Sequence, residues 1–93
     1  MRFASLDDVV RVPEDVIFRE LDGQAVILNL DTGTYFGVDS VGTRIWQLLE
    51  SRAALRDVWV ALQAEYDAAP DQLERDLLDF VDGLHAKGLV TSA

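Results

Sequence analysis

The chain has 93 residues, with 8 Lys+Arg against 17 Asp+Glu, and its formal net charge is −9. This length suits one domain, and a hydrophobic content of 49% argues against a disordered chain. The sequence contains no Cys, which excludes disulfides, thiolate metal sites and a Cys nucleophile. The acidity disfavours nucleic acid, and no apolar run is long enough to span a membrane or resembles a signal peptide. We therefore expect a cytoplasmic protein with no nucleic-acid or membrane partner.

The first part of the chain has the pattern of a small sheet. Asp22-Gly23 separates two apolar-rich runs and is a strong signal for a two-residue hairpin. Residues 31–33 supply a second turn, with Gly33 at the position that needs a left-handed backbone. The sequence therefore predicts an antiparallel meander of three strands, over residues 16–21, 24–30 and 34–38, with the second run in the middle.

After residue 38 the apolar residues recur with the period of a helix. Ser40 is expected to cap the first helix, and Pro70 to open the third. The pattern predicts three helices, over residues 41–50, 53–66 and 70–87. The order βββααα indicates an α+β fold, in which amphipathic helices cover one face of the sheet and the architecture resembles a winged helix-turn-helix. We assign residues 1–14 to a polar lead-in, either a short edge strand or loose, and residues 15–93 to the single domain.

The residue types that carry catalysis do not form a coherent set here. His85 is the only imidazole and has no second His or Cys to make a metal site or a nucleophile–base pair. Residues 31–33 match the Asp-Thr-Gly triplet of aspartic proteases, but they are explained by turn chemistry. The acids of the last helix lack the spacing of a calcium loop, although Asp76 and Asp79 flank its apolar stripe and could attract basic side chains. We expect no enzyme activity, no metal and no cofactor.

The third strand is the feature that points to binding. Residues 34–38 form an edge strand in the simplest meander, and they contain neither a charge nor a proline to protect that edge. Their backbone groups are therefore available to an added strand from a peptide. Two other occupants remain open, namely the lead-in and a second copy of the chain. If a peptide adds here, a proline at Phe36 is expected to remove one N–H from the edge.

Two motifs occur in order in the chain and resemble those of a known family. The first is G-x-Y-F-G-V-D-x-V-G-x-R-I-W over residues 33–46, and the second is D-x-x-x-F-x-x-x-L-x-x-x-G-L over residues 76–89. They resemble the PqqD-like family of RiPP recognition elements, which serve ribosomally made, post-translationally modified peptides. The resemblance covers residues 15–90 and is closest to the stand-alone member of lasso-peptide pathways. Residues 51–54 depart from the Gly-x-Thr/Ser cap of many relatives, which leaves the start of the second helix open.

The resemblance implies a winged helix-turn-helix that binds the leader of a lasso-peptide precursor rather than DNA. The leader would add to the third strand, beside the third helix, and would be presented to a leader peptidase, a transglutaminase-like protease, before a cyclase acts. The implied peptide-binding residues are Thr34, Tyr35, Phe36, Gly37, Val38, Asp76, Leu77, Phe80, Gly83 and Leu84.

Two alternatives share this architecture. One is a PqqD-type peptide carrier for a radical-SAM or another modifying enzyme. The other is a winged-helix DNA-binding protein, which usually has clustered Lys and Arg on its recognition helix. The third helix carries Arg75 and Lys87 against five acids between Asp71 and Asp82, and this balance disfavours DNA.

Overall fold

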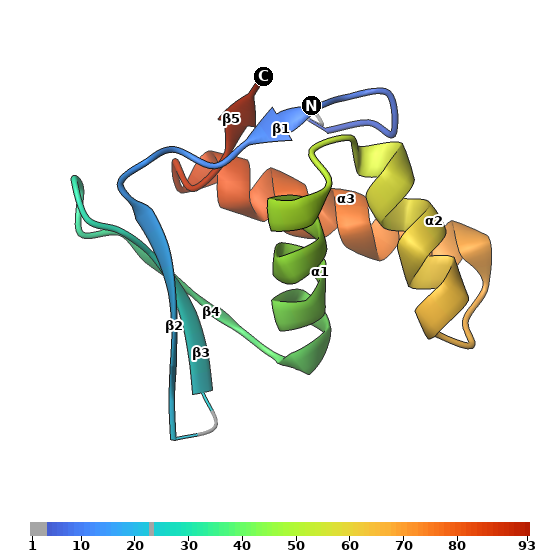
Figure 1. Ribbon diagram of the computed structural model, residues 1–93, viewed down its shortest axis with the longest axis horizontal. Helices are drawn as coiled ribbons and strands as arrows, with labels where there is room; N and C mark the ends of the chain where they lie inside the picture. Colours follow the sequence, from blue (N-terminus) through green and yellow to red (C-terminus); the bar gives the residue numbers. More distant parts are fainter. Residues whose placement is uncertain (1–3, 23) are drawn as a thin grey trace.

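A three-stranded antiparallel sheet forms one side of the molecule, and three helices form the other (Figure 1). The computed structural model describes residues 4–22 and 24–93. The strands lie in the order β2-β3-β4, and their bounds are Val16–Leu21 for β2, Gln24–Asn29 for β3 and Tyr35–Val38 for β4. The predicted meander, with its middle strand between the other two, is therefore confirmed.

The two turns of the sheet form where the sequence predicts them. Leu21 pairs with Gln24, so the connection between β2 and β3 has two residues. Asp22 has a φ of 54°, as a tight turn of this type requires, whereas Gly23 lies outside the described residues. Gly33 adopts the predicted left-handed conformation with a φ of 76°. Local backbone chemistry therefore sets the order and pairing of the strands.

The three helices follow the sheet and share one core with it. This core contains fully buried side chains from both layers, among them Ile27 of β3, Trp46 and Leu77. The helix bounds are Ser40–Ser51 for α1, Leu55–Glu65 for α2 and Pro70–Ala86 for α3. The predicted α+β fold, three strands of one sheet followed by three helices, is confirmed. Among the described residues, no helix is both long enough and apolar enough to span a membrane.

The cap of α1 differs from the prediction by one residue. Asp39 caps this helix, because its Oδ1 accepts the N–H of Gly42 at 2.8 Å. The prediction of Ser40 was wrong, since Asp and Ser are equally good N-cap residues and nothing local separates them.

The third helix, α3, begins at Pro70 as predicted. Gly88 lies just after its C-terminal end and has a φ of 72°.

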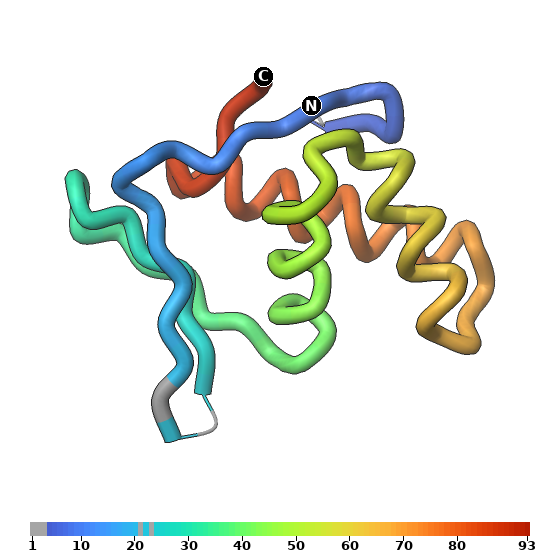
Figure 2. Tube along the Cα trace, viewed as in Figure 1, coloured from blue at the N-terminus to red at the C-terminus, as the bar shows by residue number. Residues whose placement is uncertain are grey.

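The N-terminal segment, residues 4–15, is tied to the helices and to the C-terminal end (Figure 2). Its strand β1 (Val10–Arg11) pairs antiparallel with β5 (Thr91–Ser92), and the two form a second sheet. The N–H of Ala4 also donates to Oδ1 of Asp82 in α3 at 2.8 Å. A short strand within residues 1–14 was one of the two readings of the lead-in, but β5 and its pairing with β1 were not predicted, because this pairing joins distant parts of the chain and leaves no local pattern.

The same segment sets the start of α2, which begins two residues later than predicted. The Ala53 carbonyl accepts the N–H of Val10, and the N–H of Leu55 donates to the Asp8 carbonyl, both at 3.0 Å. These bonds hold residues 53–54 beside the N-terminal segment instead of in the helix. No side chain caps α2, so the backbone of the N-terminal segment takes the place of a cap.

An ion pair joins α1 to α2 on the surface. The Arg44 guanidinium donates from Nε to Oε1 of Glu65 at 2.7 Å and from Nη2 to Oε2 at 2.6 Å. This bidentate hydrogen bonding lowers the pKa of Glu65 and raises that of Arg44. Arg44 belongs to the first sequence motif, and its contact with α2 gives it a structural role.

The ion pair predicts that acid weakens the fold. Because the pKa of Glu65 is lowered in the folded state, its stabilisation is fully present above the ordinary glutamate pKa and is lost as the pH falls through the lowered value. We expect Glu65→Gln to lower Tm slightly at about pH 7 and to have a smaller effect at about pH 3. Thermal unfolding of both proteins across this range tests the idea, and an effect of the substitution that does not change with pH would contradict it.

Candidate functional site

The outer edge of β4 offers backbone groups at alternate residues. Asn29 donates its N–H to the Thr34 carbonyl at 2.8 Å, and this bond fixes the hydrogen-bonding phase between β3 and β4. In an antiparallel ladder, hydrogen-bonded pairs alternate with pairs that are not bonded to each other. Phe36 therefore directs its backbone N–H and C=O toward β3, whereas Tyr35 and Gly37 direct theirs outward.

This alternation corrects the prediction made for a proline at Phe36. The N–H of Phe36 points to its partner Ile27 in β3, so that substitution would break the sheet instead of altering its edge. A proline removes an outward N–H at Gly37 or at Tyr35 instead. The prediction was wrong because it needed the register between β3 and β4, which the strand pattern alone does not give.

The outward side of β4 is not covered by the described parts of the chain. Within residues 4–22 and 24–93, no backbone hydrogen bond is made to the outward groups of Tyr35 or Gly37. The N-terminal segment pairs with β5 instead, so its described residues do not occupy this edge. Among the occupants considered for the edge, residues 4–14 of the lead-in are thus excluded, whereas a peptide and a second copy of the chain stay open.

An aromatic surface lies between β4 and α3, and we define it by Phe36, Phe80 and Gly83. The two phenyl rings meet edge to face, with their centroids 5.8 Å apart and their planes at 85°. A Cβ at Gly83 would lie 3.3 Å from the Phe36 ring, so the glycine allows this ring to approach α3 closely. Both phenylalanines are half-buried, which leaves part of the aromatic surface accessible next to the edge of β4.

A pocket of about 300 Å³ lies between the start of α1 and α3, and Phe80 belongs both to it and to the aromatic surface. We call it the Asp39–Asp76 pocket, and its lining residues are Asp39, Val41, Gly42, Ile45, Asp76 and Phe80. A Cβ at Gly42 would lie 3.1 Å from Cε1 of Phe80, so a side chain there would push against the pocket wall. The pocket thus combines an apolar lining with two carboxylates.

The predicted helix residues divide into two groups. Asp76 lines the pocket, while Phe80 and Gly83 contact or approach Phe36, so these three lie near the edge of β4. Leu77 and Leu84 have no exposed surface and belong to the core. Their side chains therefore pack α3 against the core and are not accessible to a ligand in this conformation.

The predicted strand residues also differ in what they offer. Tyr35 is 67% exposed, and its side chain lies on the opposite face of the sheet from Phe36. Val38 is half-buried on the helix side with Phe36, and Gly37 is exposed with no atom within 4 Å of a Cβ built on it. Thr34 precedes β4, and its carbonyl is already bonded to Asn29.

Sequence reasoning missed the contribution of α1 to the site. Asp39, Val41, Gly42 and Ile45 all line the pocket, yet none was singled out from the sequence. The available signal was the first motif itself, which places an Asp, a Val, a Gly and an Ile at these positions after the edge strand. Its meaning depends on how α1 crosses α3, which the sequence pattern does not specify.

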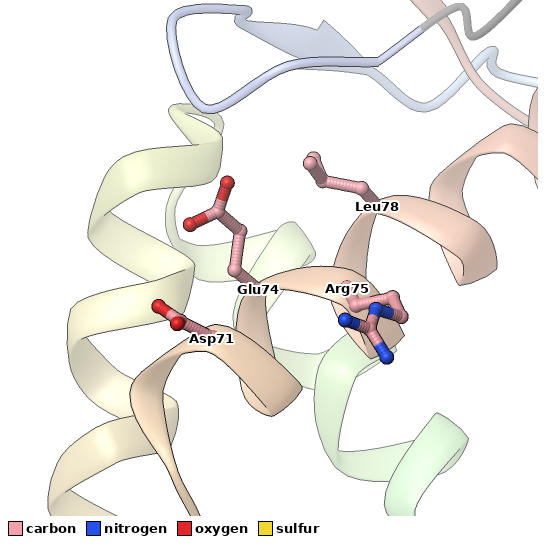
Figure 3. A pocket seen from close by; sticks show the side chains of 4 residues that line it. All are labelled: Asp71, Glu74, Arg75 and Leu78. Carbon is pink, nitrogen blue, oxygen red and sulfur yellow. The ribbon is translucent and has the colours of Figure 1, made fainter.

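A second pocket lies on another face of α3 and is lined by Asp71, Glu74, Arg75 and Leu78 (Figure 3). Its volume is about 390 Å³, and its charged side chains carry both signs. It shares no lining residue with the Asp39–Asp76 pocket. In the part of the chain that the structure describes, no group of three His, Cys, Asp or Glu residues is arranged to hold a metal ion.

Comparisons with known proteins agree with this architecture. One similar structure is TbiB1 in complex with the TbiA(beta) leader peptide, with 41% sequence identity, 86% of this chain and 93% of that chain covered, and a TM-score of 0.77. Another is lasso peptide synthetase B1 complexed with the leader peptide, with 24% sequence identity, 88% of this chain and 96% of that chain covered, and a TM-score of 0.71. At this level of identity, the second likeness shows the fold alone. No curated protein sequence is significantly similar to the chain. Residues 24–90 match the family model for coenzyme PQQ synthesis protein D, and because this match spans more than half of the chain, the protein belongs to the PqqD family.

Proposed function

We propose that this protein binds the leader peptide of a lasso-peptide precursor and that it does so as a recognition module without catalytic activity. The observation that carries the proposal is the edge of β4, where Tyr35 and Gly37 direct backbone groups outward that bond to none of the described residues, beside an aromatic surface. Support comes from TbiB1, which is 41% identical and whose structure is a complex with a leader peptide.

In this proposal the leader adds as a fourth strand along β4. The N–H and C=O groups of Tyr35 and Gly37 bond to the leader backbone, and such main-chain bonds provide affinity with little dependence on sequence. Because side chains alternate along a strand, every second leader residue faces the helices and lies on Phe36, Phe80 and Gly83. These contacts give the leader a sequence preference that the backbone bonds cannot give.

Binding of the leader serves a downstream enzyme. We propose that the protein presents the leader to a leader peptidase, a transglutaminase-like protease, and that a cyclase acts afterwards. A tethered leader raises the effective concentration of the precursor at the protease, so cleavage no longer depends on a bimolecular encounter with free precursor. Cleavage rates with and without this protein, at a precursor concentration below the KM of the protease, measure that benefit.

A second candidate keeps the same binding mode and changes the enzyme served. The match to the family model for coenzyme PQQ synthesis protein D favours a peptide carrier for a radical-SAM or another modifying enzyme. The same leader-binding edge would act in either pathway, so the two candidates differ only in the enzyme partner. Co-purification with a candidate protease or a candidate radical-SAM enzyme separates them.

The direct test is binding of a labelled leader followed by amide hydrogen exchange. We expect the fluorescein-labelled TbiA(beta) leader peptide to bind and to slow exchange at the amides of Tyr35 and Gly37. Exchange at Phe36 should change less, because its N–H is already bonded to β3. Absence of binding, or protection confined to the pocket lined by Asp71 and Glu74, would contradict the proposal.

A further inference from the structure

We propose that the Asp39–Asp76 pocket selects a leader residue with an apolar stem and a cationic end, either lysine or arginine. The inference rests on the proposed function and adds a chemical preference to one position of the leader. It is carried by the pocket lining, in which two carboxylates stand beside apolar side chains at the end of the binding strand. Strand addition by itself requires no such charge.

The position of Asp39 brings the pocket within reach of an added strand. Asp39 follows β4 directly and lies two residues beyond Gly37, the last residue of β4 with outward backbone groups. A leader strand that pairs with Gly37 and advances by about 3.3 Å per residue therefore reaches the start of α1 within two residues. Its next side chain on the helix side lies at the pocket, beyond the aromatic surface.

Both carboxylates of the pocket are hydrogen-bonded within the protein, but only to neutral donors. Oδ1 of Asp39 accepts the N–H of Gly42, and Oδ1 of Asp76 accepts Nε2 of Gln72, both at 2.8 Å. Neither bond supplies a positive charge, and neither carboxylate forms an ion pair with any residue in the described part of the chain. Arg44, the cationic side chain of α1 nearest to this turn in sequence, is bound to Glu65 of α2.

The remaining lining suits the stem of a long cationic side chain. Val41, Ile45 and the ring of Phe80 provide apolar contacts. Lysine and arginine bury their methylene groups on such surfaces while the charged end stays in water or near a counter-charge. A cation next to the Phe80 ring gains a further attraction. An uncharged side chain of the same shape would make only the apolar contacts, and the two carboxylates would repel an acidic side chain.

The test is a substitution scan of the fluorescein-labelled TbiA(beta) leader peptide. Each position in turn carries either lysine or norleucine, which share a linear stem and differ in charge. Because the protein has a net charge of −9, it attracts a lysine weakly at every position of the leader. We expect one position to exceed this background, with lysine bound about fivefold more tightly than norleucine.

Protein variants then identify the source of that preference. The double variant Asp39→Asn/Asp76→Asn should remove the preference at that position, and asparagine at residue 39 retains the helix cap. Glu74→Gln on another face of α3 changes a charge on the same helix and should leave the preference intact. A preference equal at all positions, or one that persists in the double variant, would overturn the proposal.

Strand addition and charge selection can fail separately. If the parent leader binds, and a proline at Gly37 prevents this binding, while no position prefers lysine, the charge selection is wrong and strand addition stands. If the parent leader does not bind at all, the proposed function fails and this inference fails with it.

Discussion

Replacing Gly37 with proline is expected to weaken leader binding about tenfold or more while the protein stays folded. The N–H of Gly37 points away from β3, so a proline there removes no bond of the sheet. The substitution removes one donor from the leader and places the pyrrolidine ring where the added strand must lie. One such hydrogen bond contributes about 0.5–1.5 kcal/mol, and steric exclusion of the strand adds to the loss.

Two control variants separate the lost N–H from other effects of this substitution. Gly37→Ala keeps the N–H, and its Cβ meets no atom within 4 Å, so binding should stay close to that of the parent. Glu20→Pro places the same ring on the opposite edge of the sheet. On that edge, the Leu30 N–H donates to the Asp15 carbonyl. Because hydrogen-bonded pairs alternate along the ladder between β2 and β3, the pair of Glu20 and Ala25 is not hydrogen-bonded, and Glu20 directs its backbone groups outward.

Fluorescence anisotropy with the labelled TbiA(beta) leader, together with circular dichroism of each variant, measures these effects. We expect Gly37→Pro alone to lose affinity. Equal affinity of Gly37→Pro and the parent would exclude addition of the leader at this edge. An equal loss in Glu20→Pro would instead point to a general disturbance of the sheet.

The sequence predicted the features of the fold that depend on short-range chemistry. The turns at Asp22 and Gly33 need positive φ values, and the structure has them at 54° and 76°. The third helix opens with Pro70, whose fixed φ suits a first helical position. In each case the physical requirement falls on one or two residues and is visible without knowledge of the rest of the chain.

The features that the sequence did not predict depend on contacts between distant residues. The pairing of β1 with β5 joins the two ends of the chain, and the late start of α2 results from bonds to Asp8 and Val10. The direction of the Phe36 N–H depends on the pairing phase with β3. None of these has a local pattern, because the determining partner lies far away in the sequence.

The candidate site also combines features with a local sequence pattern and features that depend on distant contacts. The sequence singled out the edge strand because residues 34–38 contain neither a charge nor a proline. Periodicity placed Phe80 on the apolar stripe of the third helix, and the family resemblance made it a candidate binding residue. The same stripe also includes Leu77 and Leu84, and periodicity cannot distinguish these fully buried residues from half-buried Phe80. The pocket residues of α1 were missed because they belong to the site only through the packing of α1 against α3.

Removal of the Phe80 ring is the second substitution with a large expected effect. Phe80→Ala takes away half of the edge-to-face pair with Phe36 and one wall of the Asp39–Asp76 pocket. Because buried aromatic anchors commonly carry about 2 kcal/mol or more of a binding free energy, we expect leader affinity to fall at least tenfold. Phe80 is half-buried in the free protein, so the fold should also lose about 1–3 kcal/mol of stability.

Trp59→Ala is the matched control, because it distinguishes lost binding from lost stability. Trp59 is also a half-buried aromatic residue packed against the core, and its Nε1 donates to the Pro70 carbonyl at 2.9 Å, at the connection between α2 and α3. We expect this variant to lose comparable stability in urea unfolding and to bind the leader as the parent does. If both variants lose affinity in proportion to stability, the Phe80 ring acts through the fold; if only Phe80→Ala loses affinity, the aromatic surface contacts the leader directly.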